Sequence, residues 1–166
     1  MKKILTILVI MLTLVIYSCT TEKKEAGVSV PFEKYTLENG LTVLLNVDKS
    51  DPIAAVAILY HVGSARETTG KTGFAHLFEH MMFQKSENVG EDQLFKLIQG
   101  AGGDLNGGTS QDVTMYYEVI PKNALEMVMW LESDRMGYLE NTVTKSAFVN
   151  QQNVVQNEKR QSVDNA

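Results

Sequence analysis

The first folded stretch of the chain alternates apolar and polar positions and then becomes almost wholly apolar. The alternation follows the turn dipeptide Asn39-Gly40, which predicts a hairpin over residues 35–47. Its apolar members are Leu41, Val43, Leu45 and Val47. After a break at Asp51-Pro52, residues 53–62 are nearly all apolar. Such a run is typical of a central strand covered on both faces.

Helical spacing replaces this pattern from residue 74 onward. Apolar residues recur at intervals of three and four, as in an amphipathic helix that packs one stripe on a sheet. The stripe consists of Phe74, Leu77, Phe78, Met81 and Met82. A shorter helix is expected over residues 91–99, ending at Gly100. Residues 100–110 contain five glycines, which predicts backbone that bends or that other groups approach closely.

The remaining pattern predicts one more strand and two more helices. Alternation at Val113, Met115, Tyr117 and Val119 indicates the strand. Asn123 and Glu126 resemble a capping box, which would open a helix with an apolar stripe. That stripe consists of Ala124, Met127, Val128 and Leu131. A last helix is expected from residue 144 to the end. The order of elements favours an α+β fold, with a mixed or antiparallel sheet and helices packed on one face.

The first 18 residues differ in kind from this domain. Lys2 and Lys3 precede an uncharged run over residues 4–16 that is rich in Ile, Leu and Val. The run has the length of a signal-peptide core and is shorter than the roughly 20 residues of a spanning helix. Residues 16–19 resemble a bacterial lipobox, in which Cys19 would be acylated. Ordinary secretion with cleavage nearby remains the alternative.

We therefore expect three parts along the chain. Residues 1–18 are expected to be a signal peptide, 19–30 a lipidated N-terminus and tether, and 31–166 the folded domain. Cys19 is the single cysteine, so no intrachain disulfide is expected. These features predict an exported lipoprotein anchored to the bacterial outer membrane, on its periplasmic side or at the cell surface.

Composition and charge narrow the class of protein further. The 166 residues are 44% hydrophobic and 21% charged, which suits one globular domain. Loss of residues 1–18 would remove two lysines and lower the formal net charge from −5 to −7. A mildly acidic chain without clustered Lys and Arg argues against nucleic acid as a partner.

The helix predicted over residues 74–82 contains the candidate metal-binding and catalytic residues. His76 and His80 are one turn apart and Glu79 lies beside them, so the three side chains project into one sector. Two imidazoles at this spacing can reach one metal ion, and Zn²⁺ suits imidazole and carboxylate ligands. Glu79 would then be the general base that takes a proton from the attacking, zinc-bound water. His61 has no partner at ligand spacing and is interpreted as structural.

A third ligand should come from another element. Glu158 follows Val154 and Val155 at intervals of four and three, which places it on the inward side of the last helix. A buried carboxylate there would be costly unless it met a metal ion. Considered without the histidines, Glu158 would be interpreted as a solvated charge.

Five motifs, in order, resemble the pitrilysin-type peptidases with the inverted zinc motif HxxEH, which include mitochondrial processing peptidases and insulin-degrading enzyme. They are residues 39–43 (NGLTV), 63–67 (GSARE), 73–80 (GFAHLFEH), 102–109 (GGDLNGGT) and 154–158 (VVQNE). The resemblance covers residues 35–166, and it implies that residues 31–166 are the N-terminal part of a zinc metallopeptidase domain. It implies a zinc-dependent endopeptidase that hydrolyses unfolded peptides and binds one Zn²⁺ per domain. Its zinc ligands would be His76, His80 and Glu158.

The resemblance also implies where the peptide binds and what else the enzyme needs. The family adds its substrate as a strand along the sheet edge, which here matches Asn106, Gly107 and Thr109. Family members often carry a second glutamate before the ligand glutamate, where this chain has Gln151. They also pair this domain with later domains or a partner subunit, so the sequence is expected to be truncated. A non-catalytic structural or binding subunit of a peptidase assembly is the alternative.

Overall fold

The computed structural model describes residues 29–164, which form parts of two compact units, Met1–Asp48 and Lys49–Ala166. In the first unit, β1 (Glu33–Thr36) pairs antiparallel with β2 (Thr42–Leu45). Gly40 turns the chain between them with a φ of 88°, which glycine adopts without steric cost. The predicted hairpin is therefore confirmed.

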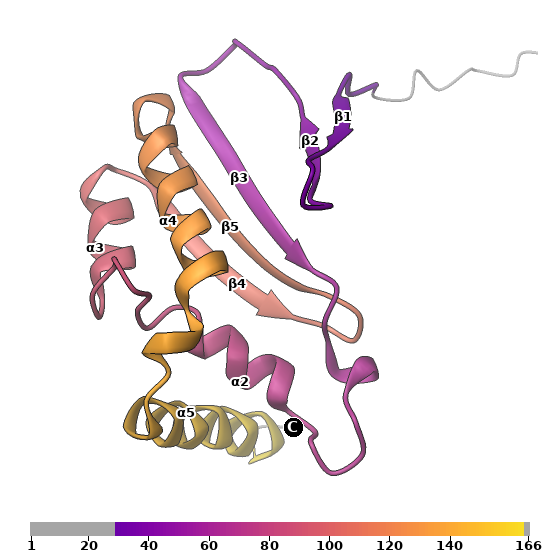
Figure 1. Ribbon diagram of the computed structural model, residues 1–166, viewed down its shortest axis with the longest axis vertical. Coiled ribbons are helices and arrows are strands. Elements are labelled where there is room, and N and C mark those ends of the chain that lie inside the picture. The colour runs from indigo at the N-terminus through magenta and orange to yellow at the C-terminus, as the bar shows by residue number, and fades with distance from the viewer. Residues whose placement is uncertain (1–28, 165–166) are drawn as a thin grey trace, which may run out of the picture. The chain divides into compact units, whose positions relative to one another are not determined.

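A three-stranded antiparallel sheet organises the second unit. Its order is β3 (Ile53–Tyr60), β5 (Thr114–Pro121), β4 (Asp104–Thr109). Figure 1 shows the long β3 and β5 side by side, with β4 along the other edge of β5. The sequence prediction missed β4, because its glycines weaken strand propensity and indicate a loop when they are considered alone.

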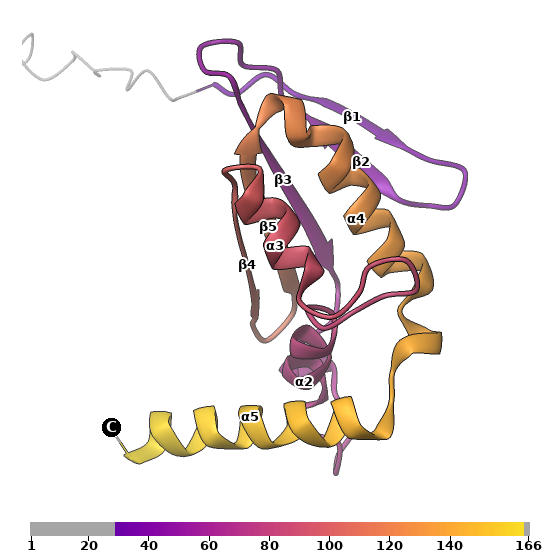
Figure 2. The same cartoon turned by 90° about the vertical axis from the view of Figure 1, so that its left-hand side faces the viewer.

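Helices cover one face of this sheet, as predicted. The covering helices are α2 (Phe74–Met81), α3 (Gln93–Gly100) and α4 (Leu125–Tyr138). The last helix, α5 (Lys145–Asp164), packs against α2. Short 3₁₀ turns lie at Ser64–Arg66, Lys122–Ala124 and Glu140–Thr142. In Figure 2, α3 and α4 lie in front of the strands, and the core forms between these two layers. Its fully buried members include Ile98, Val128 and Leu131.

Several local predictions were wrong. Among the described residues β3 is an edge strand, and Ile53 and Leu59 on one of its faces are 57% and 63% exposed. An apolar run shows that both faces are apolar, whereas which face is covered depends on the neighbouring elements. On α2 the predicted stripe is half right, because Leu77 and Met81 are buried while Phe74 and Phe78 are exposed.

The start of α4 also differs from the expected capping box. The N-cap residue is Ala124, which makes no side-chain hydrogen bond, and the 3₁₀ turn Lys122–Ala124 leads into the helix instead. The predicted stripe of this helix is confirmed at Ala124, Val128 and Leu131, all of which are buried. No helix in residues 29–164 has the length and apolarity needed to cross a membrane.

Candidate metal centre

Helix α2 presents His76 and His80 on the same side, one turn apart. Their Nε2 atoms are 3.2 Å from each other, and the two rings meet edge to face with centroids 4.8 Å apart. The side chains are 39% and 20% exposed, so both rings remain reachable from solvent. The helical spacing identified in the sequence therefore does bring both ring nitrogens to one point.

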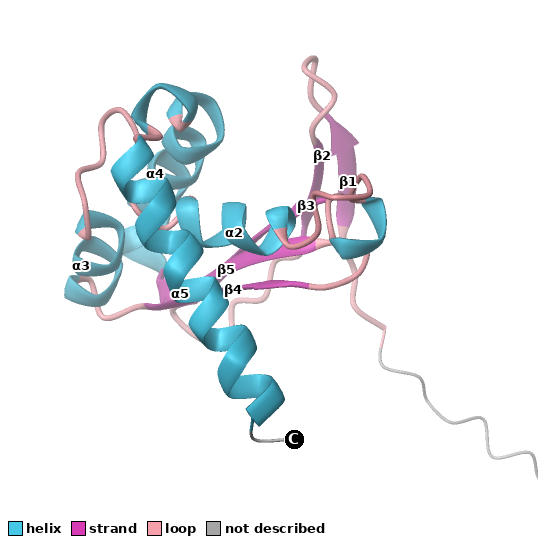
Figure 3. Ribbon diagram, turned by 90° about the horizontal axis from the view of Figure 1, so that it is seen from below, coloured by secondary structure: helices cyan, strands magenta, loops and turns pink. Residues whose placement is uncertain are grey.

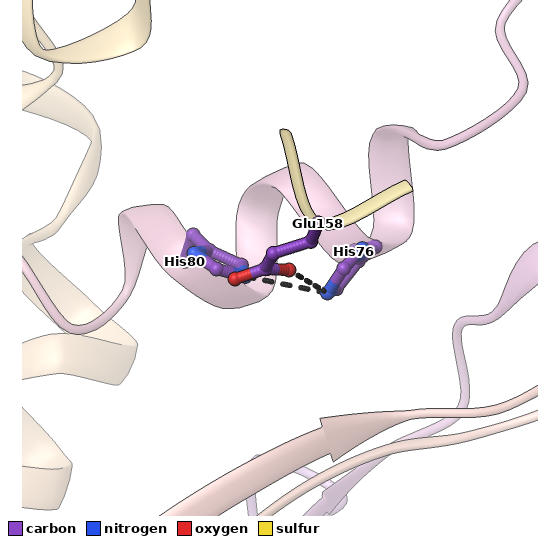
Figure 4. A group of neighbouring side chains, drawn as sticks. All are labelled: His76, His80 and Glu158. Atoms are coloured by element: carbon purple, nitrogen blue, oxygen red, sulfur yellow. Dashed lines mark hydrogen bonds and ion pairs between the residues drawn. The ribbon is translucent and has the colours of Figure 1, made fainter. Parts of the chain in front are cut away.

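Helix α5 brings Glu158 to the same point, from 78 residues further along the chain than His80. Its Oε2 atom lies 3.5 Å from Nε2 of His76 and 3.4 Å from Nε2 of His80. Figure 4 shows the carboxylate between the two histidine side chains, and Figure 3 shows α5 running past α2. Among the His, Cys, Asp and Glu side chains of residues 29–164, these three form the one group that could hold a metal ion.

The spacing of these three atoms fits a tetrahedral zinc site. Zinc bonds of about 2.0–2.2 Å to imidazole nitrogen and carboxylate oxygen place neighbouring ligand atoms about 3.3–3.6 Å apart in a tetrahedron. The three measured separations are 3.2, 3.4 and 3.5 Å. Two imidazoles and one carboxylate also form a donor set found in catalytic zinc sites, which keep a fourth position open.

Glu79 lies beside this group and outside it. The side chain is only 7% exposed, and the Thr109 hydroxyl donates a 2.5 Å hydrogen bond to its Oε2 atom. A buried carboxylate that is held by a neighbour and lies next to a ligand histidine can accept a proton from a nearby water.

Glu67, which the sequence prediction did not assign to the site, caps the start of α2. Both oxygens of Glu67 accept backbone hydrogen bonds of 2.8 Å, from Gly73 and from Ala75. The N-cap residue Gly73 has no side chain and a φ of 94°, so the cap must come from elsewhere in the chain. Glu67 is the last residue of motif 63–67, so the sequence did mark it. That its carboxylate binds the amides of Gly73 and Ala75 is seen only in the folded chain.

The predicted substrate-binding residues divide between two faces of β4. Asn106 is exposed on the face away from the helices, and its side chain accepts a hydrogen bond from the Gly107 amide at 2.8 Å. Gly107 packs against Phe83, whose ring would lie 2.9 Å from a β-carbon at this position. Thr109 faces the helices and contacts Glu79. The three residues therefore lie on one strand, but Asn106 points to the opposite face of the sheet from Gly107 and Thr109.

Three further predicted positions complete the comparison. His61 is exposed just after β3 and lies outside the metal-ligand group. Gln151 is 7% exposed on α5, at the position where the resemblance expects a glutamate. Cys19 and the predicted signal peptide lie outside the described residues.

A buried charge cluster that joins α4 to β5 was also missed. Arg135 on α4 binds both oxygens of Glu132 and lies 3.4 Å from Glu118 on β5. Its guanidinium stacks on Tyr116, 4.2 Å from the ring centroid. Burial raises the pKa of Glu118 to about 8, and the neighbouring Glu132 acts in the same direction, while Arg135 opposes the shift. Burial likewise raises the pKa of Tyr60 to about 12.

Comparison with known proteins places this geometry in a family. The model of the insulinase family, peptidase family M16, matches residues 42–166. A zinc protease of Helicobacter pylori named PqqE is 33% identical over 135 residues, covering 81% of this chain and 30% of that protein. A probable mitochondrial-processing peptidase subunit beta of Schizosaccharomyces pombe is 30% identical over 129 residues, covering 78% of this chain and 28% of that protein.

Solved structures agree with these matches. The crystal structure of a protease from Helicobacter pylori superimposes with a TM-score of 0.78 at 33% identity, covering 83% of this chain and 33% of that one. Pitrilysin superimposes with a TM-score of 0.73 at 24% identity, which shows a shared fold, and covers 82% of this chain and 14% of that one. The chain thus spans about a third or less of its relatives' length, and it belongs to the insulinase family of peptidases, M16.

Proposed function

We propose that this chain carries the catalytic centre of a zinc-dependent endopeptidase that hydrolyses unfolded peptides. The observation that carries the proposal is the convergence of His76, His80 and Glu158 at the separations expected around one tetrahedral ion. The zinc proteases among its relatives support the same cofactor.

Each residue of the centre then has a role. His76, His80 and Glu158 would hold Zn²⁺, which when bound lowers the pKa of water and polarises a peptide carbonyl. Glu79, buried beside them, would take the proton of the attacking water and later deliver it to the leaving amine. Such a positioned base contributes about 100-fold to 10,000-fold in rate.

The edge strand β4 would bind the peptide. It pairs with β5 on one side, and no strand of the described part of the chain pairs with its other side. An extended peptide added there would take its main-chain hydrogen bonds from the segment that contains Asn106, Gly107 and Thr109. This edge lies next to Glu79, because Thr109 in the same strand contacts that carboxylate.

The complete active unit, we propose, includes a later domain or a partner subunit. This chain covers 30% and 28% of the length of two peptidases that it matches. One of them is named as the beta subunit of a processing peptidase, which supports a multi-part enzyme. Activity is therefore best measured on the product of the complete reading frame, together with any partner that copurifies.

Export and lipid anchoring at Cys19 complete the proposal. Their support is the sequence pattern of residues 1–19, since the described residues begin at 29. If Cys19 carries the lipid anchor, fatty acid is incorporated into the protein only when Cys19 is present.

Substitution of Glu79 tests the catalytic assignment. Glu79→Gln keeps the shape and the acceptor for Thr109 but removes the base, so kcat toward a fluorogenic peptide should fall about 100-fold or more. Zinc content, measured by mass spectrometry, should remain at one ion per chain. His76→Ala should instead lose the zinc, because one of three ligands is gone.

Glu126→Gln is the matched control, because Glu126 is an exposed glutamate on α4. It should keep both zinc and activity. A Glu79→Gln protein with full activity and full zinc content would refute the general-base role, and a wild-type chain that binds no zinc would refute the metal centre.

A further inference from the structure

Thr109 holds the Glu79 carboxylate in place from the edge strand. We propose that it is a positioning residue for the general base, and that the neighbouring Thr114 hydroxyl holds Thr109 in turn. The inference rests on the proposed function and deepens it. It also gives Thr109 a different role from the substrate contact that the family resemblance implied.

The hydrogen bond between Thr109 and Glu79 is short, and only one of the two side chains can be its donor. The Thr109 hydroxyl lies 2.5 Å from Oε2 of Glu79. An ionised carboxylate can only accept, so the hydroxyl must donate its hydrogen. Bonds of this kind between a hydroxyl and a carboxylate are the short, strong ones. One oxygen of the base is thereby fixed to β4, and Oε1 is the atom that can take a proton from water.

A second hydroxyl supports Thr109 from behind. Thr109 ends β4 and pairs with Thr114, the first residue of β5. Directly opposite residues of an antiparallel pair project to the same face, so the two hydroxyl oxygens come within 3.1 Å. Because Thr109 gives its one hydrogen to Glu79, Thr114 must be the donor between the two threonines, and the Val62 carbonyl 3.2 Å away competes for that hydrogen. The Thr114 side chain is only 2% exposed.

The main chain around this hairpin is itself clamped. Ser64 and Ala65 donate backbone hydrogen bonds of 3.1 and 2.9 Å to the carbonyls of Ser110 and Gln111. Gly63 permits this approach, because a β-carbon there would lie 2.5 Å from the Gln111 carbonyl oxygen. The segment after β3 therefore fixes the turn between β4 and β5, and with it the two threonines.

This arrangement joins two parts of the centre that the sequence keeps apart. Glu79 belongs to the metal helix α2, whereas Thr109 belongs to the strand proposed to receive the peptide. A glutamate has several rotatable bonds, and a base must lie within hydrogen-bond reach of its proton. The Thr109 hydroxyl restricts those rotations and aligns the base with the peptide-binding edge.

A positioning role and a substrate contact differ in their kinetics. Loss of positioning lowers kcat and leaves KM nearly unchanged, because the interaction acts on the reacting groups. Loss of a substrate contact raises KM instead. The role of Thr109 can therefore be decided by steady-state measurement on the complete protein.

Thr109→Val removes the hydroxyl and keeps the shape of the side chain. We expect kcat to fall about 10- to 100-fold, as misplaced catalytic groups do, with KM changed less than about twofold and zinc content unchanged. Thr109→Ser should keep kcat within about threefold, because it restores the donor. Thr42→Val, at an exposed strand position in the other unit, is the control and should match wild type.

A double variant shows whether Thr109 acts through Glu79. In a Glu79→Gln background, Thr109→Val should cause little further loss, because residues that act as one unit are not additive. Unchanged kcat in Thr109→Val, a rise in KM alone, or a full further loss in the double variant would each overturn the proposal.

Two further outcomes are distinguishable. If Thr109→Val does not fold, Thr114→Val carries the test: a lower kcat at constant KM supports the positioning role of Thr109, and an unchanged kcat overturns it. A wild-type protein that binds zinc but cleaves no peptide would refute the proposed function and this inference together. Loss of activity in Glu79→Gln with normal kcat in Thr109→Val would refute the inference alone.

Discussion

Removal of the Glu67 carboxylate should loosen the helix that carries both histidines. Glu67 accepts hydrogen bonds of 2.8 Å from the amides of Gly73 and Ala75, at the first turn of α2. In Glu67→Ala both amides lose their partner, and a carboxylate is lost from the positive end of the helix. His76 lies one residue beyond Ala75, so the metal centre depends directly on this turn.

The size of the effect follows from these two bonds. Loss of a helix cap costs about 0.5–2 kcal/mol, and hydrogen bonds to a charged group contribute about 1.5–3 kcal/mol. Since Glu67 is half-buried and water can replace part of its contribution, we expect about 2 kcal/mol. For a chain of this size that corresponds to a fall in Tm of about 4–8 °C.

Zinc affinity should fall with helix stability. If the first turn must re-form before the ion binds, a cost of about 2 kcal/mol raises Kd by up to about 30-fold. Calorimetry of the metal-free protein measures Tm, and competition with a chelating dye measures Kd. Glu67→Gln keeps one acceptor oxygen and should lie between wild type and Glu67→Ala.

Glu38→Gln provides the control, because Glu38 lies exposed in the β1–β2 turn. Both values should be unchanged in that variant. If Glu67→Ala had the Tm and the zinc Kd of the wild type, the capping argument would be wrong, whatever the activity of the enzyme.

Two other predictions concern the buried charge cluster and the N-terminus. Burial raises the pKa of Glu118 from 4.5 to about 8, so the folded protein retains a proton that the unfolded chain releases, and stability should fall as pH rises through that window. Glu118→Gln should flatten this dependence in urea titrations between pH 5 and 8, and a slope equal to that of wild type would contradict it. Cys19→Ser should abolish incorporation of labelled palmitate into the protein, and a variant that is still labelled would exclude lipidation at Cys19.

The chemistry of the centre could be predicted from sequence because its first part is local. His76, Glu79 and His80 occupy one helix, and the helical repeat by itself places their side chains in one sector. Glu158 was harder to predict, because it lies on α5 and no sequence spacing relates it to the histidines of α2. The prediction that it is buried on the inward side of the last helix was wrong, because its side chain is 45% exposed. The family resemblance indicated it correctly, and the contact between α2 and α5 brought its carboxylate to the histidines.

Strand β4 shows where local pattern was insufficient. Its glycines predict a bend, yet β5 pairs with it along six residues and makes it an edge strand. Gly107 is required there by the ring of Phe83, which belongs to a distant segment. The sequence shows that this strand contains glycines. The reason that position 107 needs one is its contact with Phe83, which only the tertiary structure shows.

The sequence by itself determined which residues carry the candidate chemistry, the helices that present them and the α+β class, because these follow from spacing of three to four residues and from apolar periodicity. Only the tertiary structure decided that Thr109 faces Glu79, that Glu67 caps α2 and that Arg135 lies between two buried carboxylates. The Thr109–Glu79, Glu67–α2 and Arg135–Glu118 contacts join residues from different parts of the chain, and such contacts leave no periodic pattern in the sequence.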